Sequence, residues 1–204
     1  MPILSAIIVH EVAHGWVAEK FGDKTARLAG RLTLNPISHI DPLGTIALPL
    51  LCLLLPGGFI FGWAKPVPVD ARNMRHPRMD MGIVAAAGPL SNLLMAFGWA
   101  LLARYAGGLN TWFGTPLSFM AIAGMEINVM LGVLNLLPIP PLDGGRVLMS
   151  LLPPRMGWQL HRIEPFGFFI LILLMVTNVL SMILMPIIVG LLQFITSVVG
   201  LGML

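Results

Sequence analysis

The chain has 204 residues, of which 57% are hydrophobic and only 10% are charged, and its net charge is +3. Soluble domains carry about 25% charged residues, so this few charges cannot cover the water-facing surface of a globule of this size, and a soluble fold is excluded. The single cysteine, Cys52, excludes an internal disulfide and therefore a disulfide scaffold. A mean hydropathy of +0.89 indicates a membrane protein instead.

Six apolar segments follow one another along the chain, at residues 2–17, 42–63, 81–103, 116–137, 165–182 and 183–204. A helix needs about 20 residues to cross the hydrocarbon core of a bilayer, so the last four segments are predicted to span it. The first segment has no basic stretch before it and no small-residue cleavage site, so we expect a fifth span there and not a removable signal peptide. The predicted fold is an all-α polytopic membrane protein of about five to six transmembrane helices.

The segment 42–63 differs from the others because Pro49, Pro56 and the pair Gly57-Gly58 suit a broken element better than a straight span. Both of its flanks are basic, with Lys20, Lys24, Arg27 and Arg31 before it and Lys65, Arg72, Arg75 and Arg78 after it. Basic loops are cytoplasmic, and a simple span would separate the two flanks. We therefore expect a membrane-dipping or β-hairpin element at 42–63, with a true span as the alternative. We also expect a short strand or turn at 26–41, an outer N-terminus and a cytoplasmic C-terminus.

The first segment contains the sequence His10-Glu11-Val12-Ala13-His14. Histidines four residues apart lie on one face of a helix and can bind one Zn²⁺ together, and the carboxylate between them is placed to accept a proton from water. Two imidazoles and a carboxylate in an apolar membrane segment are costly unless they are paired or bind a metal. The sequence therefore predicts a metal site.

Two histidines do not complete a catalytic zinc site, which normally has three protein ligands and one water. The acidic candidates inside or at the edge of the membrane are Glu126 and Asp143. Asp143 follows three prolines between Asn135 and Gly145, so we expect it on a rigid, non-helical arm that lines a wet cleft. The alternative is a helix-ending turn with a solvated aspartate.

These motifs resemble those of the site-2 protease family of intramembrane zinc metalloproteases. The similar stretches are His10-Glu11-Val12-Ala13-His14, Gly88-Pro89-Leu90-Ser91-Asn92, Leu142-Asp143-Gly144 and residues 30–44 and 62–69. The resemblance implies that His10, His14 and Asp143 bind one Zn²⁺ per chain and that Glu11 is the general base and acid. It also implies a transmembrane protein substrate, cleaved within or near its membrane segment, at a site open to the cytoplasm. The chain is similar to compact members without PDZ or CBS domains, which favours a prokaryotic plasma membrane.

Other polar residues have less defined predictions. Asn92 could position the substrate carbonyl or the oxyanion, or could form a hydrogen bond between helices. Asn135 is a second candidate for substrate positioning and is expected to hold the Pro-rich arm, whereas Asn128 is expected to serve packing. Glu126 is expected to be neutral or to face the water cavity. The remaining histidines, His39, His76 and His161, are expected to be solvated.

We expect a single transmembrane domain at 1–204, with a catalytic core at about 1–150 and a C-terminal helical pair at about 163–204. Two other classes are weighed against a protease. A metal transporter is disfavoured because residues 165–204 contain no charged residue or histidine, so ligands do not continue across several helices. An inactive binding protein leaves Glu11 between the ligands unexplained. No basic patch interleaved with aromatic residues predicts nucleic-acid binding, and the sequence leaves the oligomeric state open.

Overall fold

The computed structural model describes residues 1–47, 50, 65–109 and 111–201, and all regular secondary structure in these ranges is helical. The long helices are α1 (Pro2–Lys20), α4 (Pro77–Gly107), α5 (Gly114–Asn135), α7 (Pro154–Val176) and α8 (Val179–Val199). The shorter elements are α2 (Thr25–Leu28), η1 (Pro36–His39), η2 (Pro42–Ala47), η3 (Ala71–Asn73) and α6 (Asp143–Leu151).

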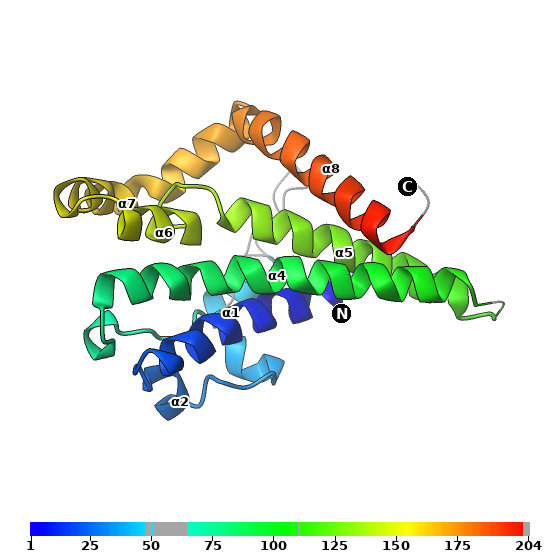
Figure 1. Ribbon diagram of the computed structural model, residues 1–204, viewed down its shortest axis with the longest axis horizontal. Helices are drawn as coiled ribbons and strands as arrows, with labels where there is room; N and C mark the ends of the chain where they lie inside the picture. Colours follow the sequence, from blue (N-terminus) through cyan, green and yellow to red (C-terminus); the bar gives the residue numbers. More distant parts are fainter. Residues whose placement is uncertain (48–49, 51–64, 110, 202–204) are drawn as a thin grey trace.

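Helix α4 is the central element, and it packs against α1, α5, α6 and α8 (Figure 1). Its buried face is rich in alanine and glycine, including Gly82, Gly88, Ala96 and Ala100. In lipid, helices gain little from burying apolar side chains and associate mainly through close packing, which small residues permit. The composition of α4 therefore explains why the other helices assemble on it.

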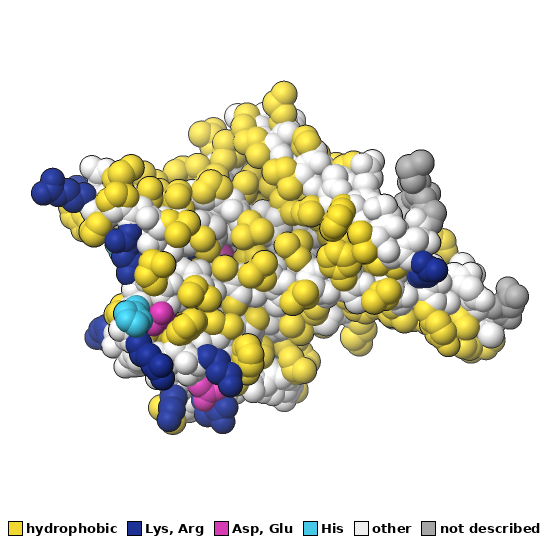
Figure 2. Space-filling model, in the orientation of Figure 1, with side chains coloured by type: hydrophobic (Ala, Val, Ile, Leu, Met, Phe, Trp, Pro, Cys, Tyr) yellow, Lys and Arg dark blue, Asp and Glu magenta, His cyan; other side chains and the backbone are white. Residues whose placement is uncertain are grey.

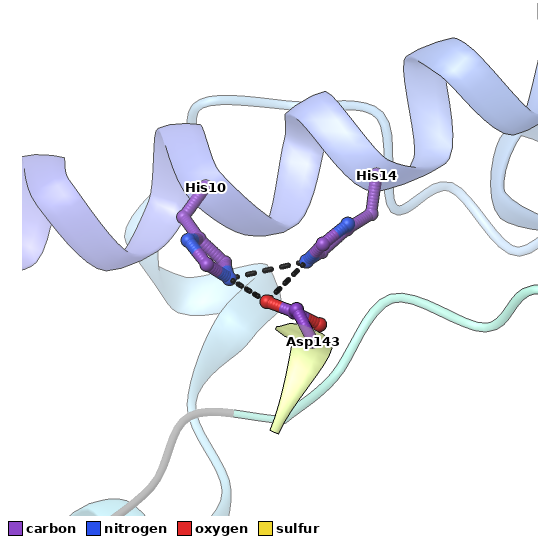
Figure 3. A group of neighbouring side chains, drawn as sticks. All are labelled: His10, His14 and Asp143. Atoms are coloured by element: carbon purple, nitrogen blue, oxygen red, sulfur yellow. Dashed lines mark hydrogen bonds and ion pairs between the residues drawn. The ribbon is translucent and has the colours of Figure 1, made fainter. Parts of the chain in front are cut away.

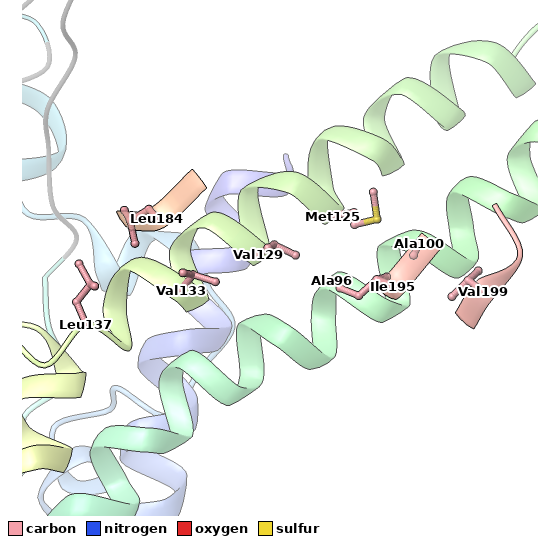
Figure 4. Close-up of a cluster of buried hydrophobic side chains, with 9 residues drawn as sticks. All are labelled: Ala96, Ala100, Met125, Val129, Val133, Leu137, Leu184, Ile195 and Val199. Atoms are coloured by element: carbon pink, nitrogen blue, oxygen red, sulfur yellow. The ribbon is translucent and has the colours of Figure 1, made fainter. Parts of the chain in front are cut away.

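A cluster of buried side chains lies where α8 packs against α4 and α5 (Figure 4). Its members are Ala96, Ala100, Met125, Val129, Val133, Leu137, Leu184, Ile195 and Val199. The Arg104 guanidinium adds a polar tie, because it donates to the carbonyl oxygen of Val199, which ends α8. A carbonyl in the last turn of a helix has no partner within the helix, so this contact satisfies it.

Four of the described helices, α4, α5, α7 and α8, are long and apolar enough to cross a membrane. The chain is thus an integral membrane protein. Helix α1 is not among the four, so the predicted fifth span remains a prediction. Hydrophobic side chains cover most of the face shown in Figure 2, and Lys and Arg gather mainly at the end of the molecule that contains α2 and the start of α7.

Two sequence-based expectations concern the chain before α4. The hairpin predicted at 42–63 lies largely outside the described residues, and only its beginning is described, as η2. The short strand or turn expected at 26–41 contains no strand; α2 and η1 occupy parts of it. The Asn35 side chain accepts a hydrogen bond from the Ile37 N–H at 3.1 Å and so caps η1, which favours a helical turn over an extended segment.

The C-terminal helices have different bounds from those predicted. Helix α7 begins at Pro154, well before residue 163, and α7 and α8 are separated at Thr177 and Asn178, not near residue 182. Asn178 adopts a left-handed conformation with φ of 59°, which ends a helix even inside a continuous apolar stretch. Hydropathy alone could not locate this break because the residues on both sides of it are equally apolar.

Candidate metal centre

His10 and His14 lie one turn apart on the inner face of α1, and both are buried. Their Nε2 atoms are 3.1 Å apart. The Asp143 Oδ2 atom lies 3.1 Å from the Nε2 of His10 and 3.4 Å from the Nε2 of His14 (Figure 3). The structure therefore brings three potential metal ligands to one point, although 129 residues separate His14 from Asp143 in the sequence.

The outer ring nitrogens of both histidines contact oxygen atoms. The Nδ1 of His14 lies 2.7 Å from the carbonyl oxygen of Val84, and the Nδ1 of His10 lies 2.5 Å from the Oδ1 of Asn92. A carbonyl oxygen can only accept, so each Nδ1 carries the proton and each Nε2 presents a lone pair to the centre. The hydrogen bonds thus select the tautomer that metal binding requires.

The arrangement fits a zinc ion. Ligand atoms at about 2.0–2.1 Å from a tetrahedral zinc lie about 3.3–3.4 Å from one another, close to the three separations in this site. Two nitrogen lone pairs and a carboxylate oxygen repel one another at this distance unless a cation lies between them. Two imidazoles and one carboxylate are also a known ligand set of catalytic zinc.

Gly88 on α4 faces the same point. A Cβ atom at this position would lie 2.6 Å from the Nε2 of His10 and even closer to the Nε2 of His14. Any side chain at residue 88 would therefore occupy the space between the ligands. The absence of a side chain at Gly88 is a steric condition for binding a metal there.

Asn92 is fully buried and belongs to a hydrogen-bond chain through three helices. Its Nδ2 donates to the carbonyl oxygen of Ala6 on α1 at 3.3 Å and to the Oδ1 of Asn128 on α5 at 3.0 Å. The Asn128 Nδ2 in turn donates to the Gly124 carbonyl oxygen at 2.8 Å. Asn92 was expected either to position the substrate or to form a hydrogen bond between helices, and the structure displays the second of these contacts. The same side chain orients His10, and Asn128 is its partner on α5.

A cavity of about 830 Å³ opens beside the three ligands. Glu11 lines it, and the Oε2 of Glu11 accepts a hydrogen bond from the Val67 N–H at 2.8 Å. Pro66 and Val69 lie on the same wall, and α4, α6 and α7 form the others. Glu11 and the three potential ligands thus line one space that can admit a peptide.

The segment that carries Val67 is held at both ends. The Lys65 N–H donates to the His39 carbonyl oxygen at 3.0 Å, and the Asp70 N–H donates to the Oδ2 of Asp23 at 2.7 Å. Asp23 is buried and also accepts from the Thr25 N–H and hydroxyl. Burial alone raises the pKa of Asp23, but the hydrogen bonds from its neighbours outweigh it and hold the pKa below the ordinary value.

The Pro-rich arm differs in part from its prediction. Asp143 is the first residue of α6 and does not lie on a non-helical stretch. Close packing fixes the arm: a Cβ on Gly145 would lie 2.5 Å from the Pro140 nitrogen, and a Cβ on Gly167 of α7 would overlap the Pro140 carbonyl. The sequence suggested a non-helical arm because three prolines precede Asp143, but proline does not prevent a helix from starting after it.

Asn135 does not hold the Pro-rich arm, and Glu126 does not line the cavity. The Asn135 Nδ2 donates to the Leu131 carbonyl oxygen on its own helix at 3.0 Å, and no hydrogen bond from it to the arm occurs among the described residues. Asn135 does line the cavity. Glu126, the other acidic candidate, is exposed on α5 and is not part of the ligand group.

One of the three histidines expected to be solvated is not. His39 is buried, with its Nε2 2.9 Å from the Thr33 carbonyl oxygen. His161 is exposed, as expected, and lines the cavity, with its Nδ1 2.7 Å from the Oε2 of Glu164. Sequence reasoning missed the pairing of His161 with Glu164 because α7 was expected to begin after His161; the spacing of three residues on a helix was the available signal.

Comparisons with known proteins identify relatives that are named as zinc metalloproteases. The model of peptidase family M50 matches residues 109–178. The chain is 40% identical over 196 residues to "Putative zinc metalloprotease YwhC" of Bacillus subtilis, covering 90% of this chain and 82% of the relative. It is 33% identical to "Putative zinc metalloprotease Rip2" of Mycolicibacterium smegmatis, covering 87% of this chain and 66% of the relative. It is 34% identical to "Putative zinc metalloprotease MJ0611" of Methanocaldococcus jannaschii, covering 71% of this chain and 65% of the relative. No solved structure gives a significant match.

Proposed function

The chain belongs to peptidase family M50, the site-2 protease family, and we propose that this metalloendopeptidase cleaves transmembrane proteins at peptide bonds within or near their membrane segments. The observation that carries the proposal is the convergence of His10, His14 and Asp143 beside Glu11, at the edge of a cavity that lies within a bundle of membrane helices. Such a site gives water and a catalytic group access to a substrate that is itself in the membrane.

His10, His14 and Asp143 would hold one Zn²⁺ per chain, which would supply a Lewis acid for the scissile carbonyl. Glu11 takes a proton from the attacking water and later donates it to the leaving amine. The Val67 N–H fixes one carboxylate oxygen of Glu11 and leaves the other available for this transfer. Asn92 and the Val84 carbonyl hold the two imidazoles in the ligating orientation.

The substrate must expose its backbone before cleavage, because a transmembrane helix hides its carbonyls in internal hydrogen bonds. Residues 65–70 and the Pro-rich arm at 138–142 border the cavity and offer backbone groups to an unwound strand. Asn135 is placed to contact the substrate from the end of α5.

The proposed location is a prokaryotic plasma membrane with the cavity towards the cytoplasm. Basic residues gather at the end of the molecule that contains α2 and the start of α7, and Arg78 and Arg146 line the cavity. Cytoplasmic loops carry such an excess of Lys and Arg.

Zinc content tests the ligand set without knowledge of the natural substrate. We expect one zinc per wild-type chain in detergent-purified protein, clear loss in Asp143→Ala, and full retention in Glu126→Gln, which removes the competing acidic candidate. Retention in Asp143→Ala together with loss in Glu126→Gln would reverse the assignment of the third ligand.

Cleavage of a single-span test substrate in liposomes tests the reaction. Glu11→Gln should keep its zinc and lose at least about 100-fold in rate, because it removes the group that moves the proton. Undiminished cleavage by this zinc-loaded variant would contradict the mechanism, and metal flux without cleavage in the wild type would favour a transporter.

A further inference from the structure

The cavity continues beyond the metal ligands, along the line where α4 and α6 pack together. Gly88 of α4 and Asp143 of α6 both lie at the ligands. Further along, Gly82 of α4 faces Ser150 of α6, since a Cβ on Gly82 would lie 2.6 Å from the Ser150 Cβ. The two helices are therefore antiparallel here, and the start of α4 marks the far end of the cavity.

Arg78 lies at that far end. It lines the cavity from the first turn of α4, ten residues before Gly88. Ten helical residues correspond to about 15 Å at about 1.5 Å per residue. An extended peptide advances about 3.3 Å per residue, so this distance equals four or five residues of a substrate strand that starts at the metal ligands.

Among the described residues, no acidic side chain pairs with the charge of Arg78 in this cavity. The Arg78 side chain is exposed and forms no hydrogen bond or ion pair within the described ranges. Arg146, which lines the cavity nearer to Asp143, lies 3.9 Å from the Oε1 of Glu164 and is thus partly neutralised. A peptide that leaves the site along α4 therefore meets an unpaired guanidinium, which prefers a carboxylate.

On these grounds, and resting on the proposed protease function, we propose that Arg78 is a specificity-determining residue. It binds an Asp or Glu side chain of the substrate located four or five residues from the scissile bond, on the side that leaves through the basic end. A lysine or arginine at the same place is disfavoured. The substrate class is therefore a membrane protein with an acidic residue just outside its cleaved membrane segment.

The test uses the full-length, zinc-loaded protein in liposomes and a single-span substrate with a neutral flank. One Glu is moved through positions two to eight from the cleavage site. We expect kcat/KM to be highest with Glu at positions four and five, about fivefold above the value for the neutral substrate, as for a partly exposed ion pair. The maximum should shrink in about 1 M salt, where the Debye length falls to about 3 Å.

Charge reversal identifies the residue. Arg78→Glu should abolish the maximum for Glu and create one for Lys at the same positions, with each rate measured relative to cleavage of the neutral substrate by the same zinc-loaded variant. Arg75→Glu is the matched control, because Arg75 is exposed three residues earlier but does not line the cavity. It should keep the preference of the wild type.

The outcomes separate this inference from the proposed function. Cleavage of the neutral substrate with no dependence on the position of Glu, or the same change in both variants, would overturn the role of Arg78 and leave the protease intact. If no substrate is cleaved, the proposed function fails. Crosslinking of the same peptides to the Glu11→Gln variant then tests whether Arg78 binds a carboxylate of the peptide. Crosslinking that depends on position supports a carboxylate site there, and uniform crosslinking refutes it.

Discussion

The helices that pack around the proposed metal ligands and the two C-terminal helices are built in different ways. In the most apolar part of α4 and of α5, 39% of the residues are buried, whereas in α7 the share is 6%. Gly167 is the single buried residue of α7 in the described chain. The first region thus has a defined interior, and α7 presents nearly all of its side chains to its surroundings.

This difference shows what each region needs from its sequence. The centre of the ligand-bearing region is polar, with Asn92 and Asn128 linking α1, α4 and α5, and amides in lipid must be paired to be tolerated. The apolar part of α7, after Glu164, needs only apolar surface, because lipid solvates its side chains as well as protein does. Substitutions should therefore have large and specific effects in the first region and small ones on α7, except where α7 contacts the arm.

The largest effect is expected at Gly88. Gly88→Ala would place a methyl group against the Nε2 atoms of His10 and His14, so we expect loss of zinc and of cleavage. Gly98→Ala is the control on the same helix, because a Cβ at Gly98 would meet nothing within 4 Å. Metal analysis and thermal unfolding of both variants would check this, and full zinc in a folded Gly88→Ala protein would contradict it.

A smaller loss is expected at Asn92. Asn92→Ala removes the acceptor of the His10 Nδ1 and leaves the Asn128 carbonyl oxygen without its donor. Zinc affinity should fall by about 10- to 100-fold, the usual effect of removing a partner of a metal-binding histidine. Competition with a zinc chelator measures this, and an unchanged affinity would show that His10 needs no such support.

The comparison can be sharpened within the C-terminal pair itself. Gly167→Ala would drive a Cβ into the Pro140 carbonyl, so α7 must move from the arm that precedes Asp143, at a cost of about 1–3 kcal/mol in the free energy of unfolding. Gly190→Ala on α8 meets nothing within 4 Å and should be neutral. Equal unfolding midpoints for the two variants would mean that α7 does not support the site.

The smallest effect is expected near the basic end, and it depends on pH. Because the pKa of Asp23 is lower in the folded chain than in the unfolded chain, its contribution to stability is present above about pH 3.9 and is lost as the pH falls through the folded pKa. The unfolding temperature of the wild type should thus fall below that pH, and that of Asp23→Asn should be lower at neutral pH and change less. If the unfolding temperatures of the two proteins changed with pH in parallel, Asp23 would not be the cause of the loss of stability in acid.

The sequence predicted the parts of this architecture that follow from local spacing. The four-residue interval between His10 and His14 placed both on one helical face, and hydropathy located α4 and α5 to within a few residues. The position of Asp143 was predicted only through its Pro and Gly neighbours and the family resemblance, and its helical conformation was missed.

Other features depend on contacts between distant segments and leave no local pattern. The buried environment of His39, the contact of Gly88 with both imidazoles and the hydrogen bond between Val67 and Glu11 are of this kind. Asn135 was expected to bind the arm because it is close in sequence, but its own helix offered the nearer carbonyl. The break at Asn178 depends on a single backbone conformation, which hydropathy does not reveal.

The separation of the ligands along the chain also has a consequence during synthesis. His10 and His14 leave the ribosome 129 residues before Asp143. At about 5–20 residues per second, the nascent chain exists for roughly 6 to 26 s with only the first two ligands. During that interval the nascent chain lacks its third proposed ligand, so this copy of the chain cannot yet act as a protease until α6 has formed.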